Sequence, residues 1–99
     1  MMKAMISQPM AGKTDEEIRA ERDSLKRNLE SRGFEVVDTV FELDVPPSEA
    51  PLLYMAKSIE AMAGCDAVVF APGWQRARGC LAERVIASLY GLKVIDVYN

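Results

Sequence analysis

Short apolar runs alternate with longer amphipathic stretches along the whole chain. Apolar or β-branched runs at 3–7, 34–41, 67–71 and 93–97 predict four strands, of which 67–71 is apolar throughout and therefore expected at the centre of a sheet. Apolar residues at helical spacing predict helices from 14 to about 32, over 52–63 and over 78–90. Each predicted strand but the last is thus followed by a predicted helix.

Turn and capping residues separate these elements. Thr14 and Glu17 match a capping box, in which each side chain bonds the other's backbone N–H at a helix start. Gly33, Gly64 and Gly91 each follow a predicted helix, where glycine readily ends one. Three prolines between 42 and 51 predict an irregular loop after the second strand.

The apolar positions also predict which helix faces are buried. In the first helix the apolar stripe is thin beside the charges, so we expect this helix to be half exposed. The second helix carries a methionine-rich stripe that we interpret as core, and the third is expected to bury one stripe of larger aliphatic residues. In chain order the three stripes are Ile18, Leu25 and Leu29; Leu52, Met55, Ala56, Ile59, Met62 and Ala63; and Leu81, Val85 and Leu89.

The alternation of strand and helix predicts one α/β domain over residues 1–99. Right-handed crossovers then give a four-stranded parallel sheet with helices on both faces, a flavodoxin-like three-layer fold with strand order 2-1-3-4. In such a sheet the loops after the first and third strands meet at the carboxyl edge, at the switch point. We therefore expect the functional site in a crevice shared by two segments, the first loop with Ser7 and the loop and helix start that lead to Glu83.

Composition excludes several classes of protein. With 49% hydrophobic and 27% charged residues the chain is typical of a globular domain. No apolar run approaches the roughly 18 residues that span a bilayer, and the N-terminus lacks a signal peptide's apolar stretch, so we expect a cytoplasmic protein without membrane contact. A net charge of −3 argues against binding a nucleic acid polymer. Cys65 and Cys80 are expected to be reduced and buried, and with no histidine we expect no metal site.

The first of the two loops resembles a phosphate-binding P-loop. Ser7 to Thr14 fits the G-x-x-x-x-G-K-[ST] pattern except that Ser7 replaces the first glycine. Pro9 also removes one backbone N–H that would hold a phosphate. We therefore interpret Lys13 as a solvated side chain and Thr14 as a helix cap.

The second loop contains groups that suit an anionic, aromatic ligand. Gly73 and Gly79 flank a turn into a helix N-terminus, where free N–H groups favour an anion, and Arg76 and Arg78 add positive charge. Trp74 can stack on a base or pack against the sheet. Glu83 lies about one turn into the helix, where it can serve as a nucleophile or merely stabilise the helix dipole, which would favour its ionised form.

Two segments, ISQPMAGKTDEEI and AGCDAVVFAPGWQRARGCLAERVIASLYGLKVI, carry a resemblance that covers nearly the whole chain. They resemble the nucleoside 2-deoxyribosyltransferase-like superfamily, and more narrowly its small, often phage-associated branch with ISGPM-type and GW-x-x-S-x-G-x-x-x-E loops. The resemblance implies that Glu83 attacks C1′ of a nucleoside or nucleotide. It also implies that the first loop holds sugar and phosphate, through Ser7, Gln8, Pro9, Met10 and Gly12.

One position departs from the pattern of the superfamily. Six residues before the glutamate the superfamily usually has Asp or Ser in contact with the substrate, whereas this chain has Ala77. We therefore keep two hypotheses. The first is an enzyme that cleaves or transfers an N-glycosidic bond through Glu83, with no metal or cofactor. The second is a non-catalytic nucleotide-binding or regulatory module that uses the same crevice.

The number of apolar helix residues also predicts a homo-oligomer, because one small sheet cannot cover them all. In related proteins a neighbouring subunit often completes the site, and Tyr98 and Asn99 are candidates for such a contribution. The residues expected to be in excess are Leu52, Leu53, Met55, Ile59, Met62, Leu81, Val85, Ile86 and Leu89.

Overall fold

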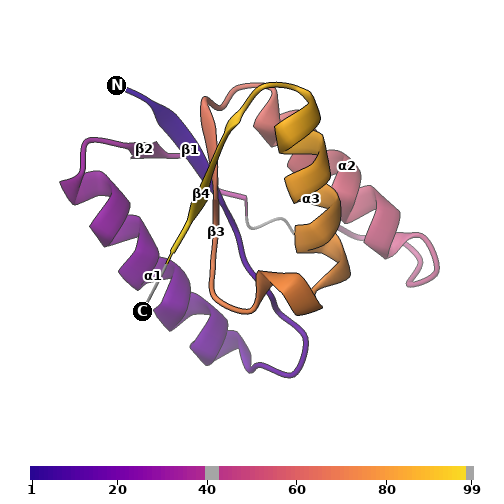
Figure 1. Ribbon diagram of the computed structural model, residues 1–99. Helices are drawn as coiled ribbons and strands as arrows, with labels where there is room; N and C mark the ends of the chain where they lie inside the picture. Colours follow the sequence, from indigo (N-terminus) through magenta and orange to yellow (C-terminus); the bar gives the residue numbers. More distant parts are fainter. Residues whose placement is uncertain (40–42, 98–99) are drawn as a thin grey trace.

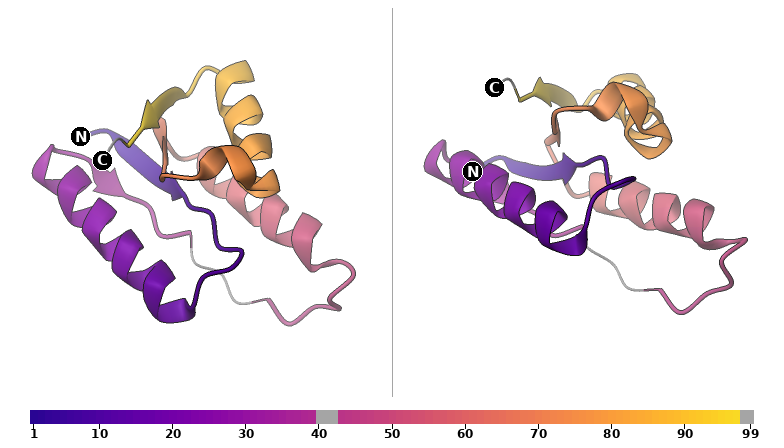
Figure 2. Two further views of the ribbon diagram at one scale, coloured as in Figure 1. Left: turned by 60° about the horizontal axis from the view of Figure 1, so that its bottom comes forward. Right: turned by 90° about the horizontal axis from the view of Figure 1, so that it is seen from below.

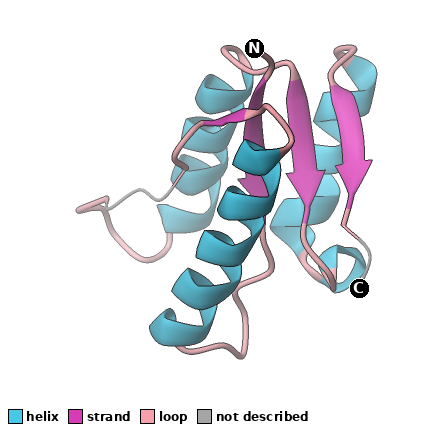
Figure 3. Cartoon of the chain, turned by 90° about the vertical axis from the view of Figure 1, so that its left-hand side faces the viewer, coloured by secondary structure: helices cyan, strands magenta, loops and turns pink. Residues whose placement is uncertain are grey.

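Four parallel strands form one sheet in the computed structural model, which describes residues 1–39 and 43–97 (Figure 1). The strands lie in the order β2-β1-β3-β4, and the arrows of β1, β3 and β4 point the same way in Figure 3. This confirms the predicted parallel sheet and its order. The strands are β1 (Lys3–Ser7), β2 (Glu35–Val36), β3 (Ala67–Phe70) and β4 (Lys93–Asp96).

Three α-helices cover the two faces of the sheet, as Figures 1 and 2 show. The helix α1 (Asp15–Ser31) packs Leu25 and Leu29 on one face, while α2 (Ala50–Met62) and α3 (Arg78–Leu89) lie side by side on the other. A short 3-10 helix, η1 (Trp74–Arg76), precedes α3. The predicted flavodoxin-like three-layer domain is therefore confirmed. Across residues 1–39 and 43–97, no helix has the length and apolar character needed to cross a bilayer.

The first helix begins and ends as predicted. Thr14 and Glu17 form both hydrogen bonds of the capping box, at 3.1 and 3.0 Å. At the other end Arg32 is the C-cap and Gly33 follows with φ +90°, a left-handed conformation that favours glycine. Most of α1 outside Leu25 and Leu29 is at least partly exposed, as its thin stripe predicts.

The second strand is shorter than the predicted 34–41. At its start, the N–H of Phe34 donates to the carbonyl of Leu29 and so belongs to the end of α1. After Val37, the hydroxyl of Thr39 lies 3.5 Å from the carbonyl of Ile6, in the place of a backbone hydrogen bond of the sheet. The chain thus leaves the sheet after two registered pairs, Lys3 with Glu35 and Ala4 with Val36. Residues 40 and 41 of the predicted strand lie outside the described residues.

The face that α3 buries differs from the predicted one. Leu81, Val85 and Leu89 are 43%, 58% and 75% exposed. The face against the sheet instead carries Cys80, Glu83 and Ala87. The small side chains of Cys80 and Ala87 let the helix pack closely on the sheet. Because Glu83 lies between them, the apolar spacing of the sequence does not predict this face as buried.

The prediction that the stripe of α2 is core was also largely wrong. Of its residues only Met62 is buried, and Leu52 at the other end is 80% exposed. The helix α2 packs mainly against α3. The helix therefore meets the sheet mainly at its carboxyl end, and its apolar outer face is left at the surface.

Candidate functional site

The loops after β1 and β3 meet at the carboxyl edge of the sheet, as predicted. Ser7 is paired with Phe70, and the N–H of Ala71 donates to the carbonyl of Ser7 at 2.9 Å. A Cβ built on Gly73 would lie 3.7 Å from Cγ of Pro9, so the two loops touch. The two loops singled out in the sequence therefore lie together at one edge of the sheet.

A buried hydrogen bond between Ser7 and Glu83 lies where β1 ends, beside these loops. The Ser7 hydroxyl donates to Oε1 of Glu83 at 2.9 Å, and the two residues are only 2% and 8% exposed. Glu83 is the sixth residue of α3, beyond the first turn, where the influence of the helix dipole has largely faded. The sequence-based alternative of a simple dipole partner is therefore weakened.

Burial controls the charge of Glu83. Loss of solvent raises the pKa of its carboxyl above the ordinary value, although the hydroxyls of Ser7 and Ser58 and the charge of Arg22 lower it. The expectation that the helix environment favours the ionised form is thus reversed. A buried carboxyl with a raised pKa at a sheet edge is typical of a catalytic group.

Three further side chains surround Glu83, and two of them were missed in the sequence. Ser58 reaches it from α2, and Arg22 lies near it from α1. Arg22 donates to the hydroxyl of Thr39 at 2.5 Å and has only 11% of its side chain exposed. Cys80, one helical turn before Glu83, is buried beside Ser7, and burial raises the pKa of its thiol.

On the α1 side, the first loop is built from side-chain contacts. Gln8 is buried and donates to the carbonyl of Ile18 and to the carboxylate of Glu21. Lys13 pairs with Glu21 at 3.2 Å, so its prediction as a freely solvated side chain was wrong. Thr14 is a cap, as predicted, and three acidic residues fill the first turn of α1. A phosphate would be repelled there, consistent with rejecting the P-loop.

The remaining residues of the first loop form its turn. Gly12 has φ +78°, a left-handed conformation that other residues rarely adopt, and the N–H of Lys13 bonds the carbonyl of Met10 at 3.2 Å. Met10 is 49% exposed, whereas Pro9 is half-buried against Gly73. All five first-loop residues of the prediction thus lie at this edge of the sheet.

Trp74 packs against the sheet edge, one of its two predicted roles. Its ring meets Phe70 edge-on at 5.9 Å, and the guanidinium of Arg84 lies 3.9 Å from its centroid. Arg84 in turn donates twice to Asp96, at 2.6 and 3.0 Å. Arg84 therefore covers one face of the Trp74 ring, so a base could stack only on the part of the ring that Arg84 does not cover. No sequence spacing indicated this contact between α3 and β4.

At the start of α3 the groups that suit an anion lie together. Ala77 is the N-cap and has no side-chain hydrogen bond, and the first turn contains no acidic residue. The first N–H bonded into the helix is that of Leu81, so the N–H groups of the first turn have no partner within the helix. Arg76 and Arg78 are both exposed here, and Gly79 packs against Met55 of α2.

The Arg84–Asp96 pair gives a test of how this edge is held together. Replacing Asp96 by Asn removes the charge that fixes Arg84, and since both side chains are a quarter exposed we expect a loss of only about 1 kcal/mol in the free energy of unfolding. Trp74 is the sole tryptophan, so its fluorescence should change as Arg84 is released. Glu35→Gln, which breaks the more exposed Lys3 pair, is the control and should leave the fluorescence unchanged. An unaltered emission spectrum in Asp96→Asn would contradict this role of Arg84.

The fold and the site together define a small parallel α/β protein with a buried serine–glutamate pair at the switch point of its sheet. The chain belongs to the family described as "Domain of unknown function (DUF4406)", which it matches over residues 2–96. Comparison with curated proteins and with solved structures gives no match. Within residues 1–39 and 43–97, no group of three or more His, Cys, Asp or Glu side chains could hold a metal ion.

Proposed function

We propose that this protein cleaves or transfers the N-glycosidic bond of a nucleoside or nucleotide, with Glu83 as the nucleophile. The observation that carries the proposal is the buried Ser7–Glu83 hydrogen bond at the switch point. The resemblance to the nucleoside 2-deoxyribosyltransferase-like superfamily supports the same assignment, since it aligns Glu83 with the nucleophilic glutamate.

The proposed reaction has two displacements at the same carbon. Because burial raises the pKa of Glu83, its carboxyl first gives its proton to solvent. The carboxylate attacks C1′, the bond from C1′ to the base nitrogen breaks, and the base leaves with that electron pair and takes up a proton from solvent. The resulting ester is then opened at C1′ by water, which gives the free sugar, or by a second base, which gives a new nucleoside, and the proton of the incoming group is released to solvent. Glu83 is regenerated as a carboxylate, so the cycle needs no metal or cofactor.

The surrounding residues suit the other parts of such a ligand. The open N-terminus of α3, with Arg76 and Arg78, suits a phosphate or other anion, and the free part of the Trp74 ring suits the base. The first loop from Ser7 to Gly12 would then face the sugar. Both cysteines are buried and free, which fits a reducing cytoplasm.

A non-catalytic nucleotide-binding module is the second candidate, and Ala77 favours it. A methyl group there offers no hydrogen bond to a substrate. The test is to incubate the protein with a panel of nucleosides and 5′-nucleotides, following free base by chromatography and binding by thermal shift. Base release supports the enzyme, binding without release supports the module, and neither binding nor release contradicts both.

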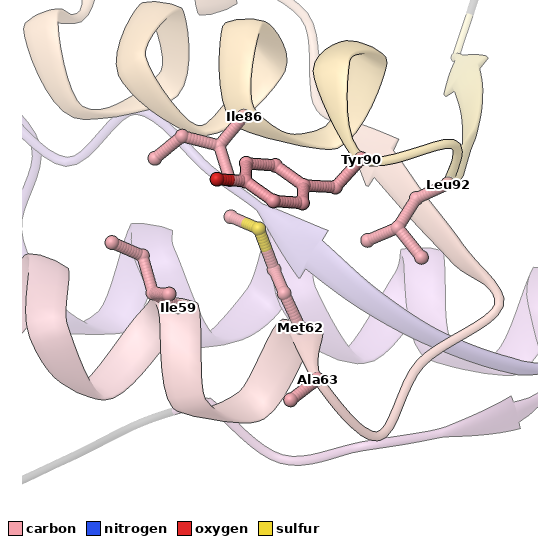
Figure 4. A pocket seen from close by; sticks show the side chains of 6 residues that line it. All are labelled: Ile59, Met62, Ala63, Ile86, Tyr90 and Leu92. Carbon is pink, nitrogen blue, oxygen red and sulfur yellow. The ribbon is translucent and has the colours of Figure 1, made fainter.

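We also propose that a second copy of the chain covers the outer face of α2 and α3. The two helices carry large exposed apolar residues, Leu52, Leu53, Tyr54, Ile59, Leu81, Val85, Leu89 and Tyr90. An apolar groove runs between the two helices, lined by Ile59, Met62, Ala63, Ile86, Tyr90 and Leu92 (Figure 4). Exposed apolar surface of this kind marks an interface, and two copies related by a twofold axis would cover the groove symmetrically.

Light scattering tests this proposal. At tens of micromolar the protein should have at least twice the chain mass of 11.0 kDa. Val85→Glu places a charge in the middle of the face and should give monomers, because burying an unpaired carboxylate is costly. Ala20→Glu adds the same charge to an exposed position of α1 and should leave the mass unchanged. A monomeric wild-type protein would contradict the proposal.

A further inference from the structure

Gln8 has a buried polar atom without a partner among the described residues, and it adjoins Ser7, the hydrogen-bond partner of the proposed nucleophile. It follows Ser7 directly, and the whole residue is only 7% exposed. Ser7 points to the α3 side of the sheet, where it meets Glu83, whereas Gln8 points to the α1 side, where it meets Ile18 and Glu21. The two adjacent residues thus place polar groups on both sides of the same crevice.

The orientation of the Gln8 amide is fixed by its surroundings. Its nitrogen donates to the carbonyl of Ile18 at 2.8 Å and to Oε1 of Glu21 at 2.9 Å. Both partners can only accept, so turning the amide over would bring its oxygen against two other oxygens. The carbonyl oxygen is therefore the atom that remains, and it is buried with no hydrogen-bond partner among the described residues.

A buried acceptor without a donor is rare in folded proteins and destabilises them. A donor supplied by a ligand would remove that cost. The donor must be an O–H or N–H group and not a phosphate, because an ionised phosphate oxygen has no proton to donate to the Gln8 carbonyl oxygen. The neighbouring carboxylate of Glu21 already has its own cation, since Lys13 lies 3.2 Å from it. The turn that follows Gln8 lies at the surface and is closed by the Lys13–Met10 hydrogen bond, so a ligand would reach Gln8 from that side.

We propose that Gln8 selects the ligand of this crevice by accepting a hydrogen bond from a hydroxyl or amino group of the nucleotide, so that the phosphate is turned away from α1 and toward α3. This inference rests on the proposed function and adds the direction in which the ligand lies. The resemblance implies that the first loop holds both the sugar and the phosphate. In this inference Gln8 binds a hydrogen-bond donor of the ligand, and the phosphate binds elsewhere.

Titration calorimetry with matched nucleotides tests the inference. The probes are the 5′-monophosphates of adenosine, guanosine, cytidine and uridine, their 2′- and 3′-deoxy analogues, and purine riboside monophosphate, which lacks the amino group of adenosine monophosphate. For wild-type protein, loss of the group that contacts Gln8 should weaken binding at least about fivefold. In Gln8→Met, which has no acceptor oxygen, the same pair of probes should bind equally well.

Two further variants separate the explanations. Glu21→Gln keeps an acceptor for the Gln8 nitrogen and should retain the discrimination between probes. Gln8→Lys replaces the acceptor by a cation, so it should weaken binding if a donor group lies there and strengthen nucleotide binding if the phosphate does. Stronger binding by Gln8→Lys, or equal discrimination in wild type and Gln8→Met, would overturn the inference while leaving the proposed function intact. If no probe binds wild-type protein, the proposed function itself fails and the inference with it.

Discussion

Replacing Glu83 by Gln should reduce the release of free base by at least about a thousandfold, because the neutral amide cannot attack C1′. Ligand affinity should change by less than about threefold, since glutamine keeps the size of the side chain and can still accept the hydrogen bond from Ser7. The measurement is base release under single-turnover conditions together with calorimetric binding. Glu30→Gln, an exposed change on α1, is the matched control and should leave both quantities unaltered.

The same variant should alter how stability depends on pH. Burial raises the pKa of Glu83 in the folded state, so the unfolded chain loses this proton first as the pH rises. The free energy of unfolding of the wild-type protein therefore falls between the unfolded and the folded pKa of this group, whereas Glu83→Gln lacks this contribution. The variant should gain stability relative to wild type as the pH rises above the ordinary glutamate pKa of 4.5. Denaturant titrations at several pH values measure the difference.

Two results would contradict the role of Glu83 as nucleophile. Equal rates of base release by wild type and Glu83→Gln would exclude it as the attacking group. A stability difference that stays constant across the pH range would show that Glu83 is not held in a buried site. A variant that binds normally but releases no base would support the nucleophile hypothesis and separate it from a loss of folding.

Much of the fold was predictable because it depends on local chemistry. The capping box at Thr14 and Glu17 is a contact between residues three apart, and the strand order follows from alternation and the hand of the crossovers. The meeting of the first and third loops follows from that order. Ser7 and Glu83 were therefore predictable as neighbours, although they are 76 residues apart in the chain.

The helix faces were harder to predict because hydrophobicity is a poor guide when a helix packs closely. In α3 the buried positions are Cys80, Glu83 and Ala87, and the larger Val85 and Leu89 are exposed. Such a sequence contains two stripes at helical spacing. The apolar spacing predicts that the larger aliphatic residues are buried, whereas in the structure the stripe with the small side chains packs on the sheet.

The partners of the site residues could not be predicted from spacing at all. Ser58 and Arg22 act on Glu83 from two different helices on opposite faces of the sheet, Ser58 through a hydrogen bond and Arg22 through its charge. Arg84 meets Trp74 while it is paired with Asp96. Each contact depends on the tertiary packing of side chains. The raised pKa of Glu83 follows from that packing, and not from its place in the helix.

Restoring a hydroxyl at Ala77 should have the second large effect, and it has two separable parts. Ala77 is the N-cap of α3, with φ −109° and ψ 118°, and it offers no side-chain acceptor to the first turn. Ala77→Ser should cap the N–H of Gly79 or Cys80 and stabilise the protein by about 1 kcal/mol, which for a domain of this size raises the melting temperature by about 4–8 °C. Scanning calorimetry measures this part.

The second part concerns catalysis. A serine hydroxyl that accepts from a helix N–H still has its own proton to donate, so it can contact a substrate while it caps the helix. If the missing hydroxyl is what limits the wild-type protein, Ala77→Ser should increase base release at least about tenfold. The increase should vanish in the double variant with Glu83→Gln, because the new contact can act only through the nucleophile.

Ala77→Gly distinguishes a substrate contact from a better-formed helix. Glycine is also a favourable N-cap but has no hydroxyl, so it should reproduce most of the gain in stability and none of the gain in base release. Equal activity in the Gly and Ser variants would assign the effect to the order of α3 and its Glu83, and not to a hydrogen bond with the substrate. A Ser variant that is more stable yet releases no base from any nucleotide of the panel would favour the binding module, because the scaffold would then have its carboxylate and its hydroxyl and still perform no chemistry.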